Sequence, residues 1–127
     1  MCNYVDEARI SELNFPMVED EAKISAALRR NASAVVEALR ELGSCSYAAM
    51  GDLAFYSTFW RLCRFVARKM PNVEIEVVPG VPSFCACAAE ARVPIAIGSE
   101  VVAIAPLGAA SKLRELAKFA DSLLLIK

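Results

Sequence analysis

The feature that most constrains the fold is an alternation between short apolar runs and segments with helical spacing. Segments of strand length with closely spaced apolar residues occur at residues 8–15, 46–50, 74–78, 101–105 and 122–126. Most of these runs are unbroken, which is typical of strands that are buried on both faces. Since helical segments separate them, the chain is predicted to be α/β, with a mostly parallel sheet that carries helices on both faces.

Four segments with helical spacing lie between these runs. Asp20 is placed to cap the first, and Gly43 to end it. Ser83 is a plausible N-cap for the third. The second has an apolar stripe formed by Phe55, Phe59, Leu62, Phe65 and Val66. Helices are therefore expected at about residues 21–42, 54–69, 83–92 and 111–118.

The composition fits one domain over residues 1–127 with a substantial core, because 57% of the residues are hydrophobic. The formal net charge is -1, so the chain lacks the excess of basic residues that is typical of nucleic-acid binders. No apolar run approaches the roughly 20 residues of a membrane span. The first residues are polar and acidic, unlike a signal peptide. We therefore expect a cytoplasmic protein with neither a nucleic-acid nor a membrane partner.

The five cysteines are odd in number, which favours reduced thiols. Cys85 and Cys87 are two residues apart, so on a helix they point to different faces and are poorly placed to chelate. We expect them to be small buried thiols between helix and sheet, and we expect no metal site. A thiol-based metal or redox module stays as an alternative. The chain has no histidine, which excludes histidine-based triads and zinc sites.

Two turns follow predicted strands, at residues 50–52 and 78–83. Both would lie at the carboxyl edge of a parallel sheet, where ligands bind in open α/β folds. Gly51 and Gly80 would allow close approach to the main chain, and Asp52 would accept hydrogen bonds. From the residues alone, left-handed glycine turns and a helix cap explain these positions at least as well. The chain has no Gly-x-Gly-x-x-Gly motif and no phosphate-binding loop.

Two sequence blocks carry a resemblance to a known family. Gly51-Asp-Leu-Ala-Phe-Tyr-Ser-Thr-Phe59 closely resembles the Gly-Asp-Pro-x-Phe-Tyr-Ser-Thr-Phe signature of precorrin-2 C20-methyltransferases, which belong to the tetrapyrrole methylases of cobalamin biosynthesis. Val77-Val-Pro-Gly-Val-Pro-Ser-Phe-Cys-Ala-Cys-Ala-Ala89 is similar to the family's Val-Val-Pro-Gly-Val-Ser-Ser-Phe-x-Ala-x-Ala-Ala. Weaker matches extend the resemblance over nearly the whole chain, at residues 13–17, 93–95, 100 and 124–127.

The resemblance implies methyl transfer from S-adenosylmethionine (SAM) to C20 of a reduced tetrapyrrole, either precorrin-2 or cobalt-precorrin-2. Family members have two α/β domains with SAM in the cleft between them, and they form homodimers. The positions carried over as SAM contacts are Met50, Gly51, Asp52, Phe55, Pro82 and Ser83. No catalytic residue is assigned, because the SAM sulfonium is already activated and the enzyme mainly aligns the reacting atoms.

The chain also departs from the family pattern. Leu53 stands where the signature has proline, and Pro82 stands where a serine or threonine would offer SAM a hydroxyl group. We expect the chain to lack the family's first strand, with its Gly-x-Gly-Pro-Gly-Asp loop, and the C-terminal domain. These expectations leave a second hypothesis open, a non-catalytic structural or dimerisation module derived from a tetrapyrrole methylase.

Overall fold

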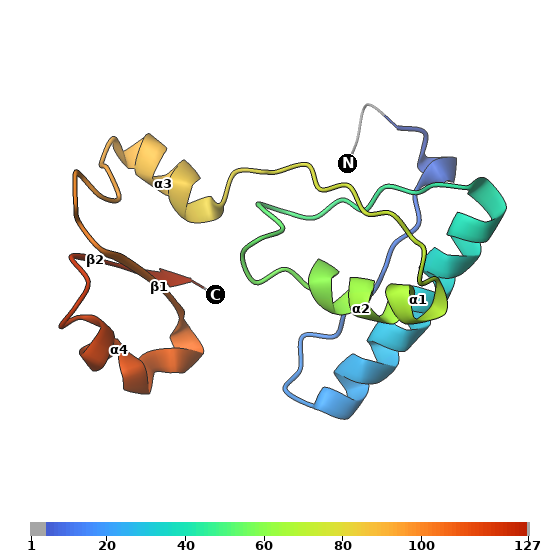
Figure 1. Cartoon of the computed structure of the whole chain (residues 1–127), viewed down its shortest axis with the longest axis horizontal. Coiled ribbons are helices and arrows are strands. Elements are labelled where there is room, and N and C mark those ends of the chain that lie inside the picture. The colour runs from blue at the N-terminus through green and yellow to red at the C-terminus, as the bar shows by residue number, and fades with distance from the viewer. Residues whose placement is uncertain (1–4, 127) are drawn as a thin grey trace. The chain divides into compact units, whose positions relative to one another are not determined.

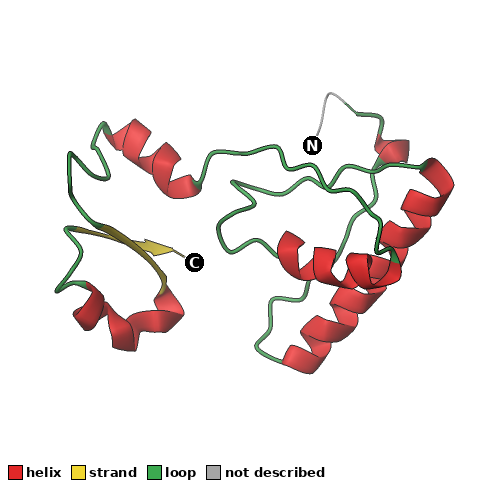
Figure 2. Ribbon diagram, viewed as in Figure 1, coloured by secondary structure: helices red, strands yellow, loops and turns green. Residues whose placement is uncertain are grey.

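The computed structural model describes residues 5–126, which form two compact units that divide between Val78 and Pro79. Figure 1 labels their helices and strands, and Figure 2 shows that both strands lie in the second unit. The first unit holds the 3-10 helix η1 and the helices α1 and α2. The elements are η1 (Glu7–Arg9), α1 (Glu21–Leu42), α2 (Phe59–Lys69), α3 (Ser83–Ala91), β1 (Val102–Pro106), η2 (Leu107–Ala109), α4 (Ala110–Leu116) and β2 (Ser122–Ile126).

Helix α1 begins and ends where the sequence predicts. The Asp20 Oδ1 atom accepts hydrogen bonds from the backbone N–H groups of Ala22 at 2.9 Å and Lys23 at 3.2 Å. At the other end, Gly43 adopts a left-handed conformation with φ 79° and donates its N–H to the Leu39 carbonyl oxygen at 3.0 Å. Since a residue with a side chain enters this conformation at a cost, glycine is the favoured residue there.

Substitution of Asp20 by alanine is expected to lower the free energy of unfolding by about 1 kcal/mol, because two N–H groups of α1 lose their acceptor. Urea unfolding followed by the fluorescence of Trp60, the one tryptophan of the chain, measures this change. The control is Glu19→Ala, which removes a neighbouring exposed carboxylate that does not cap the helix. Equal stability of the two variants would contradict the capping role.

Helix α2 packs against α1 and forms the core of the first unit. Leu28, Ala32 and Val36 of α1 meet Leu62 and Val66 of α2 in one buried cluster. Partly buried residues from the flanking segments cover this cluster, among them Leu13, Phe15, Tyr47, Met70 and Val73. The apolar stripe predicted for the second helix is therefore confirmed at its centre, and it faces the first helix.

Two polar contacts lie at the edges of this helix pair. One joins α1 to the segment before it, and the other joins α1 to α2. The side chain of Asn31, which is buried, donates from Nδ2 to the Asn14 carbonyl oxygen at 2.9 Å. Arg61 pairs with Glu21 at 2.8 Å on the exposed side, where an ion pair contributes about 0–1 kcal/mol. The buried amide therefore anchors the segment before α1, while the ion pair adds little stability.

The second unit contains a parallel strand pair. Val102 to Pro106 of β1 lie beside Ser122 to Ile126 of β2, in register from end to end. Helix α4 connects the two strands and contacts β1, and Figure 1 shows α3 and α4 on opposite sides of the pair. The predicted α/β class with parallel strands and helices is therefore confirmed. Whether residues 1–127 act as one domain stays a prediction.

Three of the predicted strands are wrong. Residues 8–15 include the 3-10 turn η1, and residues 46–50 and 74–78 lie outside regular secondary structure. An apolar run becomes a strand only when a neighbouring backbone takes up its hydrogen bonds. The runs at 101–105 and 122–126 pair with each other as parallel strands. The described part of the first unit contains no strand pair.

The expectation of buried thiols in α3 is also wrong. Cys85 and Cys87 are exposed, as is Cys45, while Cys63 on α2 is half-buried. Cys2 lies outside the described residues. Burial raises the pKa of the Cys63 thiol, so this side chain is less nucleophilic at neutral pH than a free cysteine. Within residues 5–126, no helix has the length and apolarity that crossing a membrane requires.

Candidate functional site

The segment from Gly51 to Phe55 forms a tight turn that the side chain of Asp52 closes. Gly51 has φ 74°, a left-handed conformation that other residues seldom adopt. The Asp52 Oδ1 atom accepts the N–H of Ala54 at 2.7 Å, and the Asp52 carbonyl oxygen accepts the N–H of Phe55 at 3.5 Å. Asp52 thus occupies the first position of a four-residue turn, where aspartate is favoured for this reason.

The turn continues into a second bend that delays the start of α2. Tyr56 has φ 51°, which interrupts helical geometry two residues before the cap. The Ser57 hydroxyl then accepts the N–H of Phe59 at 3.2 Å and satisfies one of the free donors at the helix start. The helix predicted from residue 54 therefore begins at Phe59, because the segment before it is held in turns.

Trp60 ties this turn to the first residues of the helix. Its indole Nε1–H donates to the carbonyl oxygen of Leu53 at 2.8 Å. The indole also lies edge-on to the ring of Phe59, with centroids 5.2 Å apart, and Phe59 is itself buried. The turn is consequently anchored to the core of the first unit through Trp60 and Phe59.

Apolar side chains next to this turn are open to solvent. Met50 is 99% exposed, Tyr56 46% and Phe55 39%. In the sequence these three side chains flank Gly51 and Asp52, and Gly51 is itself exposed. Such a surface offers apolar contact for a purine ring or a thioether, together with a carboxylate for a cationic group.

Pro82 and Ser83, the other predicted SAM contacts, begin α3 in the second unit. Pro82 is the N-cap residue, and its carbonyl oxygen accepts the N–H groups of Cys85 at 3.0 Å and Ala86 at 3.1 Å. The prediction that Ser83 caps this helix is wrong by one residue, since Ser83 is its first residue and no side chain caps it. Gly80 is not among the described glycines with positive φ, so the left-handed turn expected there is also wrong.

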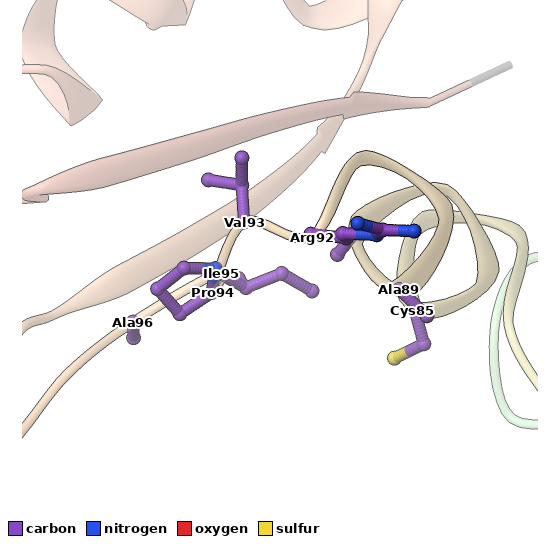
Figure 3. A pocket seen from close by; sticks show the side chains of 8 residues that line it. Cys85, Ala89, Arg92, Val93, Pro94, Ile95 and Ala96 are labelled. Atoms are coloured by element: carbon purple, nitrogen blue, oxygen red, sulfur yellow. The ribbon is translucent and has the colours of Figure 1, made fainter.

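Two open apolar pockets adjoin α3. One, of about 490 Å³, lies between α3 and β2, and Ser83, Phe84 and Cys87 line it together with all five residues of β2. The other, of about 480 Å³, lies at the end of α3, where Cys85 and Arg92 meet the segment 93–96 (Figure 3). Only Ser83 among the predicted site residues lines either pocket.

The six predicted residues therefore fall into two groups. Met50, Gly51, Asp52 and Phe55 share one turn of the first unit, and Pro82 and Ser83 share the start of α3 in the second. The sequence did not predict the hydrogen bond from the Trp60 indole to the Leu53 carbonyl oxygen or the left-handed conformation of Tyr56. Among residues 5–126, no group of three or more cysteine, aspartate or glutamate side chains is arranged to hold a metal ion.

Comparison with known proteins gives this geometry a context. Residues 1–127 match the family of tetrapyrrole (corrin/porphyrin) methylases. The chain belongs to this family. The resemblance inferred from the Gly51–Phe59 and Val77–Ala89 blocks is thereby confirmed for the tetrapyrrole methylases as a whole.

Two curated relatives narrow the comparison within the tetrapyrrole methylases. The chain is 34% identical over 122 residues to a probable cobalt-precorrin-2 C(20)-methyltransferase of Methanocaldococcus jannaschii, with 94% of this chain and 47% of the relative covered. It is 31% identical over 127 residues to the cobalt-precorrin-2 C(20)-methyltransferase of Salmonella typhimurium, with 96% of this chain and 51% of the relative covered. This tetrapyrrole methylase chain thus spans about half the length of both relatives.

The residues of the turn suit the ligand that the resemblance implies. SAM carries an adenine ring, a sulfonium and an amino acid moiety, so it needs apolar surface, main-chain contact and negative charge. In this tetrapyrrole methylase Met50 and Phe55 are apolar and exposed, Gly51 has no side chain, and Asp52 carries a carboxylate. Pro82 carries no hydroxyl group, whereas the neighbouring Ser83 is exposed and carries one.

Proposed function

We propose that this chain is part of a SAM-dependent methyltransferase that methylates cobalt-precorrin-2 at C20 in cobalamin biosynthesis. The similarity to two relatives, one named a cobalt-precorrin-2 C(20)-methyltransferase and the other a probable one, carries the proposal and extends over 96% and 94% of this chain. The relatives' names favour the cobalt form of the substrate over precorrin-2 itself. The turn at Gly51 and Asp52 adds a surface whose chemistry suits SAM.

The geometry of the turn suggests a role for each of its residues in SAM binding. SAM, when bound, supplies a methyl group that its sulfonium already activates for transfer. Gly51 leaves room for main-chain contact, and Met50 and Phe55 provide apolar surface beside it. Asp52 holds the turn through Ala54 and places negative charge beside the ligand, where it favours a cationic sulfonium or amino group. Pro82 and Ser83, at the start of α3, are the positions that the family resemblance adds to the proposal.

A non-catalytic module is the second candidate, and one observation favours it. Asp52 already has a structural role as the acceptor for Ala54, which a module without a cofactor would retain. The two candidates differ in one respect that can be measured, since only the methyltransferase binds SAM. The proposed homodimer and the cytoplasmic location stay predictions under both.

Two substitutions of Asp52 separate its charge from its role in the turn. Asp52→Asn keeps a side-chain oxygen that accepts the N–H of Ala54, whereas Asp52→Ala removes both acceptor and charge. Calorimetry on the wild-type chain is expected to detect binding of SAM and of S-adenosylhomocysteine, which lacks the sulfonium charge. We expect Asp52→Asn to weaken SAM binding about three- to tenfold, in line with the loss of one charge-assisted contact, and to affect S-adenosylhomocysteine less.

Asp52→Ala shows how much SAM binding is lost when the turn loses its hydrogen bond to Ala54. Asp52→Ala is expected to weaken both ligands, because the turn itself loosens. If the wild-type chain binds neither ligand, even when the uncovered half of the M. jannaschii relative is supplied as a separate polypeptide, the non-catalytic module becomes the better description.

A further inference from the structure

We infer that Trp60 is a positioning residue for the turn that carries Gly51, Asp52 and Phe55. Its indole N–H bonds to the Leu53 carbonyl oxygen at 2.8 Å, which joins the middle of the turn to the first turn of α2. This inference rests on the proposed function, because it assigns Trp60 to the SAM site proposed above. No predicted contact residue makes this link, and Trp60 itself need not touch the ligand.

The position of Leu53 explains why the turn needs such a link. The hydrogen bond from the Phe55 N–H to the Asp52 carbonyl oxygen makes Leu53 the second residue of a four-residue turn. Proline is favoured at that position because its ring fixes φ near the required value. Leucine leaves φ free, and at 3.5 Å the closing hydrogen bond is long. The bond from Trp60 restrains the same residue from outside the turn.

The surroundings of Trp60 allow it to act as a fixed point. Its neighbour Phe59 is buried in the first unit, and the two rings contact each other edge-on. The left-handed Tyr56 and the hydrogen bond from the Phe59 N–H to the Ser57 hydroxyl lie between Leu53 and Trp60, and the indole bond to Leu53 spans them. At 44% exposure, the indole can be replaced by another aromatic ring without opening a cavity in the core.

The proposal makes the two restraints interchangeable. Trp60→Phe keeps an aromatic ring against Phe59 but removes the donor to Leu53. Leu53→Pro supplies the missing restraint from within the turn. The effect of Trp60→Phe should therefore be large in the wild-type background and small in the Leu53→Pro background. A merely structural contribution of the indole to the fold would be the same in both backgrounds.

The test uses the whole chain and two readouts. Hydrogen exchange of the Ala54 and Phe55 amides, measured by NMR, reports the order of the turn, and calorimetry with SAM reports the site. Trp60→Phe is expected to speed exchange at both amides and to weaken SAM binding about two- to tenfold, the range for one lost hydrogen bond. Trp60→Phe with Leu53→Pro is expected to lie within about twofold of Leu53→Pro alone. Arg64→Gln, an exposed change one turn further along α2, is the control.

The readouts distinguish failure of the inference from failure of the proposed function. Unchanged exchange in Trp60→Phe would overturn the tether. Faster exchange with unchanged SAM affinity would overturn its role at the site. If the wild-type chain binds no SAM, the proposed function fails, while the exchange measurements still decide whether Trp60 orders the turn.

Discussion

Replacing Leu28 by alanine is expected to lower the free energy of unfolding of the first unit by about 2–5 kcal/mol. Leu28 is 1% exposed and lies at the centre of the contact between α1 and α2. Its removal loses apolar burial and leaves a cavity among side chains that come from both helices. Since a small domain has only about 5–15 kcal/mol of stability, this change alone removes a large part of it.

Leu42→Ala is the matched control, because it makes the same chemical change at the end of the same helix, where the side chain is 74% exposed. Urea unfolding followed by Trp60 fluorescence reports on this unit, since α2 carries the fluorophore. We expect Leu42→Ala to stay within about 0.5 kcal/mol of the wild type. Similar losses for the two variants would show that the interface between α1 and α2 is not the core of the unit.

Replacing Gly51 by valine is expected to weaken SAM binding at least about tenfold. A β-branched residue at φ 74° is strained by roughly 1–2 kcal/mol or more, so the chain relaxes away from the turn geometry that presents Asp52 and Phe55. The same strain lowers the stability of the turn, but the buried cluster between α1 and α2 does not involve it. The loss should therefore appear mainly in binding, measured by calorimetry.

Two further glycine variants sharpen this experiment. Gly108→Val makes the same change in η2, at a glycine without positive φ and with no other atom within 4 Å of the added Cβ, and it should leave SAM binding unchanged. Gly51→Asn should weaken binding less than valine does, because asparagine tolerates the left-handed region. If Gly51→Val and the wild type bind SAM with equal affinity, the turn at Gly51 is not part of the SAM site.

Helices could be predicted from the sequence where a single residue sets a boundary. Asp20 and Gly43 act through their own side chain or backbone conformation, so the limits of α1 followed directly. The strands at 101–105 and 122–126 were also predicted well, because each supplies the partner that the other needs. The runs at 46–50 and 74–78 have the same length and are also rich in apolar residues, but they have no strand partner, and composition does not reveal pairing.

The site was predictable in its residues but not in its shape. The Gly51–Phe59 block identified the turn and its family, and Asp52 was expected to cap a helix. It closes a four-residue turn instead, because the left-handed Tyr56 stops the helix from starting there. The link from Trp60 to Leu53 spans seven residues across two bends. A leucine at a turn position that favours proline was the one signal that an outside restraint was needed.

The central claim is tested most directly by methyl transfer from SAM to cobalt-precorrin-2, detected by mass spectrometry of the tetrapyrrole. The chain is combined with the uncovered half of the M. jannaschii relative, and the intact relative is the positive control. We predict a product that carries one additional methyl group at C20, with a strongly reduced yield for Gly51→Val. An unmethylated tetrapyrrole, under conditions in which the intact relative converts it, would contradict the proposed function.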